Sequence, residues 1–146
     1  MSCLKTEFLG VSMKNPLVTS SGCFGFGKEY QDYFDPNQLG GIVLKGITLE
    51  ARDGNYGVRI AETPGGMLNC VGLENPGIDV FEQEIIPNLR KEGITTNLIV
   101  NINGKTMEDY IEIAKRVDNI DEIAIVELNI SCPNVKDGGM AFGANP

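Results

Sequence analysis

The sequence predicts an α/β fold built on a parallel sheet, and two observations carry this prediction. Short runs of Ile, Val and Leu alternate along the chain with segments whose apolar residues have helical spacing. Strands that alternate with helices form parallel sheets through crossover connections. The apolar runs are also continuous instead of alternating with polar residues, which is typical of strands covered on both faces. With 146 residues, the chain is long enough for one domain, residues 1–146, with a hydrophobic core.

Four buried strands are predicted, each from its own apolar run. They are "NPLVTSSG" (15–22), "GGIVLKGIT" (40–48), "NLIVNING" (97–104) and "IAIVELNI" (123–130). Before them, "LKTEFLGVSMKN" (4–15) fits a small antiparallel β-hairpin.

Three helices are predicted between these strands. The first is short and covers "KEYQDYF" (28–34), and the second covers 78–91. One face of the second helix carries its apolar residues, which are Ile78, Phe81, Ile85 and Leu89. Pro87 should kink or shorten this helix, because proline lacks the N–H that a helix interior uses.

The third helix begins at Thr106 in "TMEDYIEIAKRV". Asp109 is placed to complete a capping box with Thr106. The apolar positions 107, 110, 111, 114 and 117 fall at helical spacing and predict the buried face.

A long Gly- and Pro-rich segment, 50–77, separates the second and third predicted strands. It includes "AETPGGMLNCVGLENPG". Segments of this length without regular structure are usually lids or binding loops, or else disordered.

Composition excludes several classes of function. The net charge of −8, without Lys/Arg patches, argues against a nucleic-acid or anionic-membrane surface. The absence of histidine excludes Ser-His-Asp and Cys-His catalysis within this chain. No apolar window is long enough to span a membrane and no secretory signal opens the sequence, so we expect a cytoplasmic protein.

The four cysteines, Cys3, Cys23, Cys70 and Cys132, show no C-x-x-C spacing. Without histidine, a zinc site would need all four thiolates or help from carboxylates. We therefore expect no metal site and four reduced thiols, most of them in the core.

Polar residues collect at the carboxyl ends of the predicted strands. They are Ser20 and Ser21, Lys45, Asn101, and the run from Asn129 to Asn134. Four strand–helix units fit either an open doubly wound sheet or half of an eight-stranded barrel. Both architectures place their ligand site at this end of the strands.

Two of these residues have a structural and a functional interpretation. Cys132 is either a structural cysteine, which composition alone favours, or an acid–base group, since a thiol has a pKa of roughly 8.5. Lys45 lies between apolar residues, where an ammonium group serves a buried strand poorly. It either extends to solvent or contacts a cofactor, and Gly46 beside it favours the second interpretation because it lets a ligand approach the backbone.

Three asparagines are candidates for ligand recognition. Asn69 lies in an otherwise apolar glycine-rich loop, while Asn129 and Asn134 follow the fourth strand. Their side chains suit a planar heterocycle with amide and carboxylate groups, although isolated asparagines also form turns and caps.

With these residues in view, the sequence resembles the dihydroorotate dehydrogenases. The resemblance rests on "NPLVTSSGCFGFGKEY", "KGITLEARDGN", "RIAETPGGMLNCVGLENPG" and "ELNISCPNVKDGGMAFG", and it runs through nearly the whole chain. The stretches "AETPGGMLN" and "VNING" look more like the catalytic subunit of the NAD-linked two-subunit class than like the fumarate-linked class.

The resemblance implies a (β/α)8 TIM barrel that binds FMN and oxidises dihydroorotate to orotate in de novo pyrimidine (UMP) biosynthesis. Cys132 would take the C5 proton, and a hydride from C6 would pass to N5 of FMN. Flavin contacts would be Ser21, Lys45, Gly46, Asn101 and Asn129. Substrate contacts would be Lys45, Asn69, Cys70, Val71, Gly72, Leu73, Asn129 and Asn134.

The resemblance also implies partners. Electrons would reach NAD through a second subunit that carries FAD and a 2Fe–2S cluster, and the catalytic subunit would form a homodimer within a heterotetramer.

Barrels of this family are about twice as long as this chain, so it would cover the first four β/α units, a half barrel with the N-terminal β-hairpin. We therefore expect a truncated chain that binds FMN poorly and shows no turnover alone. Two alternatives stay open: a non-catalytic half-barrel assembly module, and a related flavin barrel such as dihydropyrimidine dehydrogenase, which shares the "N-x-S-C-P" element.

Overall fold

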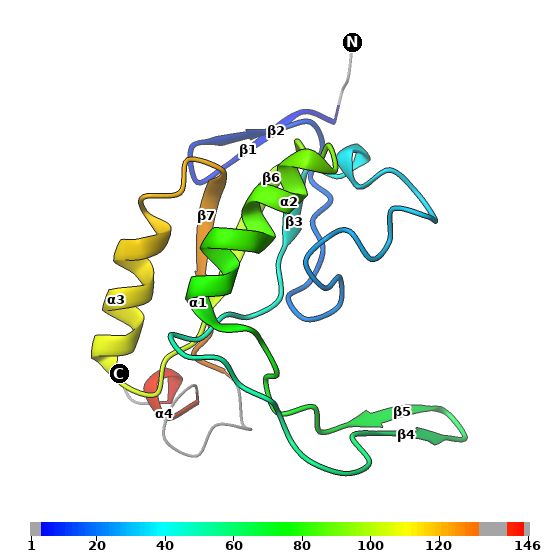
Figure 1. Ribbon diagram of the computed structural model, residues 1–146. Helices are drawn as coiled ribbons and strands as arrows, with labels where there is room; N and C mark the ends of the chain where they lie inside the picture. The colour runs from blue at the N-terminus through cyan, green and yellow to red at the C-terminus, as the bar shows by residue number, and fades with distance from the viewer. Residues whose placement is uncertain (1–3, 132–139, 145–146) are drawn as a thin grey trace.

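The computed structural model describes residues 4–131 and 140–144, and its centre is a three-stranded parallel sheet. The strands lie in the order β3 (Gly41–Val43), β6 (Asn97–Ile102) and β7 (Ile123–Leu128) (Figure 1). The predicted parallel sheet is confirmed, and these strands fall within three of the four predicted ranges.

Helices cover one face of this sheet. The segment between β3 and β6 forms α1 (Gly77–Val80), a π-helical turn η2 (Phe81–Ile85) and α2 (Ile86–Lys91), and α3 (Met107–Val117) connects β6 to β7. Side chains of both helical segments form the main core with Ile42, Leu44, Leu98, Val100 and Ile102 of the sheet region. Among the helices of the described ranges, none has the length and apolar character needed to cross a membrane.

The opposite face of the sheet has a different covering. Val43 and Ile99 form a small cluster there with Met13, and Ile125 packs against it. Sequential strand order with both helical segments on one face fits the (β/α)8 barrel family, because a doubly wound sheet has helices on both faces.

The predicted helix over 78–91 is confirmed, and the π-helical turn explains how it passes Pro87. Pro87 has no N–H and its ring crowds the carbonyl group four residues earlier. The widened turn Phe81–Ile85 lies immediately before it and inserts an extra residue into the helical repeat. As a result, Ile86 is buried as well, while Ile85 packs against the core from a partly buried position.

The third predicted helix and its cap are confirmed. The Thr106 side chain accepts a hydrogen bond from the Asp109 N–H, and the Asp109 carboxylate accepts one from the Thr106 N–H. The predicted buried face was partly wrong, because Met107 and Ile111 are exposed and Ile113 is fully buried. The buried residues of α3 are Tyr110, Ile113 and Val117. Helical spacing alone did not distinguish them from the apolar residues next to them.

Arg116 joins α3 to the preceding helical segment through two carboxylates. Its guanidinium donates to Glu82 at 2.5 Å and to Asp79 at 2.6 Å. The hydrogen bonds to Glu82 and then to Asp79 raise the pKa of Arg116 above its ordinary value. The two helical segments are therefore tied by charge as well as by apolar packing.

The predicted N-terminal hairpin is confirmed as β1 (Thr6–Phe8) and β2 (Val11–Met13). It lies across the amino-terminal end of the parallel strands (Figure 1). Met13 is buried against the sheet, and Asn97 Nδ2 donates to the carbonyl of Ser12 at 3.2 Å. This hairpin closes the end of the sheet opposite to the expected ligand site.

Two sequence predictions near the N-terminus were wrong. The strand predicted over 15–22 is reduced to a parallel bridge between Val18 and Gly41. The backbone N–H of Val43 bonds instead to the hydroxyl oxygen of Thr19 at 2.9 Å, so a side chain replaces a ladder bond.

The helix predicted over 28–34 is a series of turns. A single helix of this length is unstable in water without strong packing, and here Tyr33 is 83% exposed. A short 3₁₀ helix, η1 (Pro36–Gln38), follows after Asp35, whose side chain caps it.

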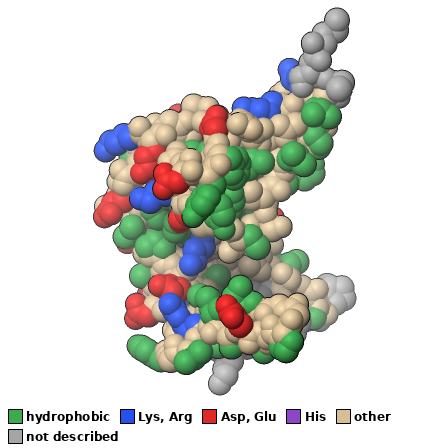
Figure 2. Space-filling model, turned by 90° about the vertical axis from the view of Figure 1, so that its right-hand side faces the viewer, with side chains coloured by type: hydrophobic (Ala, Val, Ile, Leu, Met, Phe, Trp, Pro, Cys, Tyr) green, Lys and Arg blue, Asp and Glu red, His purple; other side chains and the backbone are tan. Residues whose placement is uncertain are grey.

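The segment 50–77 contains a second antiparallel hairpin that the sequence did not predict. It consists of β4 (Ile60–Thr63) and β5 (Gly66–Asn69), joined by Pro64 and Gly65. Every residue from 60 to 70 is exposed. The hairpin extends away from the sheet (Figure 1), and Figure 2 shows hydrophobic side chains on the surface of the lower part of the molecule.

The last described helix is the short α4 (Met140–Gly143).

Candidate functional site

Two of the predicted site residues, Asn101 and Asn129, meet at the carboxyl end of the sheet. Asn101 lies in β6 and is 2% exposed, and Asn129 follows β7. Asn129 Nδ2 donates to Asn101 Oδ1 at 3.3 Å, and the backbone N–H of Asn129 donates to the carbonyl of Ile102 at 2.9 Å. Parallel strands bring these amides together because their carboxyl ends share one edge.

Two further polar residues belong to the same group, and sequence reasoning missed both. Asn103 Nδ2 donates to Asn101 Oδ1 at 2.9 Å, and Asn101 Nδ2 donates to Glu127 Oε1 at 2.5 Å. Glu127 lies directly opposite Asn101 in the register of β6 and β7. The signal available in the sequence was a spacing of two, 101 with 103 and 127 with 129, which places each pair on one face of its strand. We call Asn101, Asn103 and Asn129 the rim amides.

Tyr110 of α3 was expected to fill the core, and it also holds the backbone beside Asn129. Its hydroxyl donates to the carbonyl of Asn129 at 2.6 Å. Its ring meets Phe142 of α4 edge to face, with ring centres 5.6 Å apart. One side chain therefore contacts the chain on both sides of residues 132–139.

The segment after β3 brings Lys45 and Gly46 to the same end of the sheet, and Ser21, from the segment before β3, contacts it there. Ser21 Oγ donates to the carbonyl of Leu44 at 3.4 Å. A methyl group on Gly46 would lie 2.7 Å from Asn103 Nδ2 and 2.8 Å from Asn101 Oδ1, which is too close for any side chain. Gly46 is therefore required for the rim amides to sit against this backbone.

Lys45 is half-buried, and its backbone N–H donates to the carbonyl of Gly25 at 2.8 Å. It lines a shallow pocket of about 360 Å³ that also includes Phe26, Arg52 and Glu74. An ammonium group at this position can pair with an anionic ligand group.

The predicted substrate loop, 69–73, is divided between the hairpin and the sheet. Asn69 and Cys70 are exposed, and the Cys70 backbone bonds to Arg59 and to the side chain of Asn55. Val71 accepts a hydrogen bond from the Asn55 N–H at 2.9 Å. The contacts found for these three residues lie within the base of the hairpin.

Leu73 is the member of this loop that reaches the rim. Its Cδ1 would lie 3.2 Å from a methyl group on Gly46. Leu73 has a φ of 58° and follows Gly72 with a φ of 82°, so two successive residues adopt left-handed backbone. Such strain in a non-glycine residue persists only where the surroundings hold it, and it is concentrated at functional sites.

Asn75 holds this strained loop in place. Its side chain is buried, donates to the carbonyl of Leu73 at 2.8 Å and accepts from the Thr48 N–H at 3.1 Å. Asn75 thereby ties the loop to the residues that follow β3, consistent with the turn role that isolated asparagines usually have.

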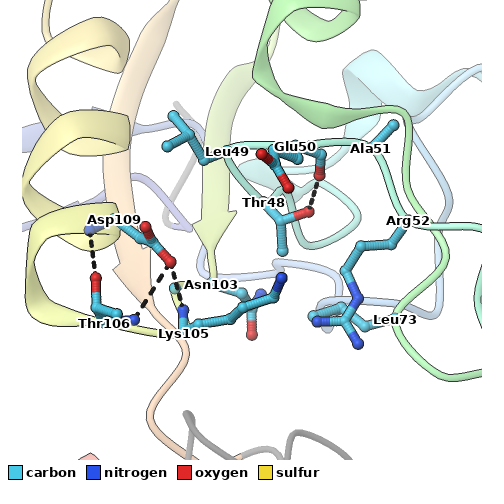
Figure 3. A pocket seen from close by; sticks show the side chains of 11 residues that line it. Thr48, Leu49, Glu50, Ala51, Arg52, Leu73, Asn103, Lys105, Thr106 and Asp109 are labelled. Carbon is cyan, nitrogen blue, oxygen red and sulfur yellow. Dashed lines mark hydrogen bonds between the residues drawn. The ribbon is translucent and has the colours of Figure 1, made fainter.

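A pocket of about 250 Å³ opens beside the rim (Figure 3). Its lining comes from the segment 48–52, from Leu73, and from the start of α3 with Asn103, Lys105 and Asp109. Asn103 is 2% exposed, and its Oδ1 has no hydrogen-bond donor within the described ranges. A buried amide oxygen without a donor is uncommon in folded proteins, and this one can accept a hydrogen bond from a ligand or a water molecule.

The cysteine prediction needs a correction. Cys23 and Cys70 are exposed free thiols, so these two do not fill the core. Cys23 lies in a glycine-containing turn and Cys70 lies at the hairpin, and neither side chain is enclosed by apolar residues. Cys3, Cys132 and Asn134 lie outside the described residues, so their predicted roles stay predictions.

Comparison with protein families decides which family this arrangement represents. The family model described as dihydroorotate dehydrogenase matches residues 3–146. The chain belongs to the dihydroorotate dehydrogenase family.

Curated relatives agree with this assignment. The chain is 58% identical over 145 residues to a protein of Brachyspira hyodysenteriae named dihydroorotate dehydrogenase B (NAD(+)), catalytic subunit, covering 99% of this chain and 47% of the relative. Proteins with the same name from Alkaliphilus metalliredigens and Bacteroides thetaiotaomicron are 53% and 50% identical, covering 98% and 99% of this chain and 46% and 47% of the relatives. The chain thus spans about half the length of the curated relatives it matches.

A solved structure supports the fold independently. The structure, described as DHODH from Eimeria tenella in complex with ferulenol, superimposes with a TM-score of 0.70 at 24% identity. The match covers 91% of this chain and 38% of that chain. In this member of the dihydroorotate dehydrogenase family, Ser21, Gly46, Leu73, Asn101 and Asn129 converge at one end of the sheet, whereas Asn69, Cys70 and Val71 lie at the hairpin.

Proposed function

We propose that this segment supplies one rim of the active site of an enzyme that oxidises dihydroorotate to orotate in pyrimidine synthesis. The observation that carries the proposal is the convergence of Gly46, Asn101 and Asn129, which follow or belong to three different strands. The identity to the NAD(+)-type catalytic subunits supports the same activity.

The proposed architecture is the first four β/α units of an eight-stranded barrel, preceded by the β1–β2 hairpin. The sequential strand order and the helices on one face support it. On the other face the cluster around Val43 is small, and the remaining strands of a barrel would enlarge it. Val126 and Leu128 of β7 pair with Val100 and Ile102, so they lie on the helix-covered face, where they are 38% and 57% exposed. The next helix of a barrel would cover them.

Cys132 is the proposed base that removes the C5 proton of dihydroorotate. A thiolate can accept a proton from carbon once it is placed against the substrate. Asn129 supports that placement, because its Oδ1 accepts from the backbone N–H of Ser131 at 3.3 Å, directly before Cys132. Asn129 and Asn134 would hold the substrate, and Lys45 would pair with its negative charge.

The loop 69–73 is the proposed cover of the substrate. Leu73 contacts the rim, and the exposed Asn69 and Cys70 lie further out on the hairpin. The Asn75 side chain fixes the inner end of this loop. We infer that the loop shields the site from water while its amide recognises the heterocycle.

FMN is the proposed cofactor, and the described residues fit a planar heterocycle with N–H groups. Asn103 Oδ1 is a buried acceptor without a donor among the described residues, and Gly46 lets the rim amides lie against its backbone. FMN, when bound, supplies the two-electron acceptor of the reaction. Ser21, Lys45, Gly46, Asn101 and Asn129 would hold it, and their task is orientation and exclusion of water.

The proposed electron route ends at NAD in a cytoplasmic complex. A second subunit with FAD and a 2Fe–2S cluster would receive the electrons, and two catalytic subunits would pair within a heterotetramer. The NAD(+) in the names of the relatives supports this route.

A joined protein tests the proposed function. It consists of residues 1–146 followed by the C-terminal half of the Brachyspira hyodysenteriae relative, which completes the barrel. We expect it to purify with a flavin absorbance spectrum and to oxidise dihydroorotate, whereas Cys132→Ser keeps the flavin and loses most of the turnover. The 146-residue chain alone should retain little flavin and show no turnover.

Other outcomes have defined meanings. A colourless joined protein without turnover would contradict the proposal. A stable colourless dimer of the 146-residue chain would favour the assembly-module alternative. Turnover of dihydropyrimidines in preference to dihydroorotate would favour the related flavin barrel.

A further inference from the structure

Glu127 makes a hydrogen bond that fixes more than its own position. Its Oε1 accepts from Asn101 Nδ2 at 2.5 Å. A carboxylate offers only acceptors, whereas an amide offers donors on one side and an acceptor on the other. The amide of Asn101 must therefore turn its NH₂ group toward Glu127 and its oxygen away from it.

This orientation determines the next amides in turn. With Asn101 Oδ1 facing the other rim amides, Asn103 and Asn129 must each present Nδ2 to it, at 2.9 and 3.3 Å. Their oxygens are then left as acceptors. Asn129 Oδ1 receives the N–H and hydroxyl of Ser131, and Asn103 Oδ1 remains without a donor among the described residues.

We propose that Glu127 is a positioning residue that sets the direction of all three rim amides. Glu127 and Asn103 are absent from the roles that the family resemblance assigned. The proposal rests on the proposed function, because it explains why this rim offers amide oxygens. It follows that a ligand beside Asn103 must supply an N–H or O–H group, and that the Ser131 backbone is held through a chain of bonds beginning at Glu127.

Two variants of the joined protein separate this role from a general packing role. In Glu127→Gln, the new amide can either accept from Asn101 or donate to it, so residue 127 no longer fixes the direction of the network, and a reversal breaks the bond from the Ser131 N–H. In Glu127→Gln combined with Asn101→Asp, the carboxylate and the amide exchange places. The carboxylate at 101 again accepts from Asn103 and Asn129, so the direction of these two amides is restored. Glu112→Gln, on the exposed side of α3, is the matched control.

The direct readout is the set of asparagine side-chain NH₂ signals in ¹⁵N NMR spectra, with the hydrogen-exchange rate of the Ser131 backbone N–H. Glu127→Gln should double or displace the signals of Asn103 and Asn129 and speed exchange at Ser131. The exchanged double variant should return both to single signals and restore slow exchange at Ser131. Glu112→Gln should leave all of these as in the unaltered protein.

Turnover provides a second readout. Glu127→Gln should lower kcat for dihydroorotate on the order of tenfold, since small misplacements of catalytic groups reduce rates strongly. A single, unshifted set of NH₂ signals in Glu127→Gln, with unchanged exchange at Ser131, would overturn the proposal even if the joined protein is active. An inactive joined protein whose signals change as expected would leave Glu127 in its positioning role and would count against the proposed function instead.

Discussion

The rim of the parallel sheet and the β4–β5 hairpin both carry proposed ligand contacts, but they are held in different ways. Asn101 and Asn103 are 2% exposed, and each makes side-chain hydrogen bonds within the sheet. The hairpin is exposed throughout, with Met67 64% and Leu68 66% exposed, and it is fixed at its base by the Arg59–Glu74 pair and Asn55. Burial therefore positions the rim amides, whereas a few polar contacts at its base position the hairpin.

The largest expected difference between the two regions is in stability. Phe81 is fully buried beneath the sheet, and removing its ring in Phe81→Ala should lower the free energy of unfolding by about 3–5 kcal/mol. Leu68→Ala on the hairpin should change it by less than about 0.5 kcal/mol, because its side chain is already in water. Urea unfolding of the joined protein measures both, and equal losses would show that the hairpin packs more tightly than its exposure indicates.

Gly46→Ala is the next largest effect and acts on the rim alone. The added methyl group would lie 2.7 Å from Asn103 Nδ2, so the rim amides must move, at a cost of roughly 1–3 kcal/mol. Flavin absorbance per protein should fall as well. Gly65→Ala at the tip of the hairpin is the matched control, since a methyl group there meets nothing within 4 Å. A Gly46→Ala protein with full flavin content would show that the rim accommodates a side chain.

Tyr110→Phe should have a smaller effect, because it removes one hydrogen bond and keeps the ring. Loss of the bond to the Asn129 carbonyl should cost about 0.5–1.5 kcal/mol of stability. The expected kinetic signature is a lower kcat with little change in KM, as the backbone before Cys132 loses a support. Tyr33→Phe, at an exposed position, is the control for loss of a hydroxyl group.

Arg59→Gln should have a small effect on stability and a measurable effect on binding. The Arg59 Nη1 to Glu74 Oε2 distance is 2.6 Å, but both side chains are partly exposed, so solvent reduces the contribution to at most about 1 kcal/mol. Releasing the base of the hairpin should raise KM for dihydroorotate with kcat nearly unchanged. A fall in kcat with constant KM would instead show that this ion pair supports the rim amides and not the hairpin.

Sequence patterns were sufficient where one local signal acted alone. The apolar runs of β6 and β7 and the Thr106–Asp109 capping box were found because each is encoded by neighbouring residues. The strand predicted over 15–22 was wrong for two reasons. Pro16 lacks an N–H, and the Thr19 hydroxyl accepts from the Val43 N–H, a contact between residues far apart in the sequence. The β4–β5 hairpin was missed because glycine and proline obscure its alternation.

The same division applies to the candidate site. Lys45, Gly46, Asn101 and Asn129 were predicted because polar residues and glycine stand out at the end of apolar runs. Asn103 and Glu127 were missed because their importance depends on register: Glu127 lies opposite Asn101 only once β6 and β7 are paired. Family resemblance supplied the roles, and the paired strands supplied the hydrogen bonds.

The Thr19 side chain has a consequence for self-association. Its hydroxyl oxygen accepts from the Val43 N–H at 2.9 Å, and the hydroxyl lies 3.4 Å from the Val43 carbonyl, so both backbone groups that a foreign strand would seek are already engaged. Within the described residues β7 is the opposite border of the sheet and carries exposed Val126 and Leu128. Intermolecular β-pairing should therefore start at β7. Val126→Lys should reduce aggregation, measured by light scattering, more than Val18→Lys does.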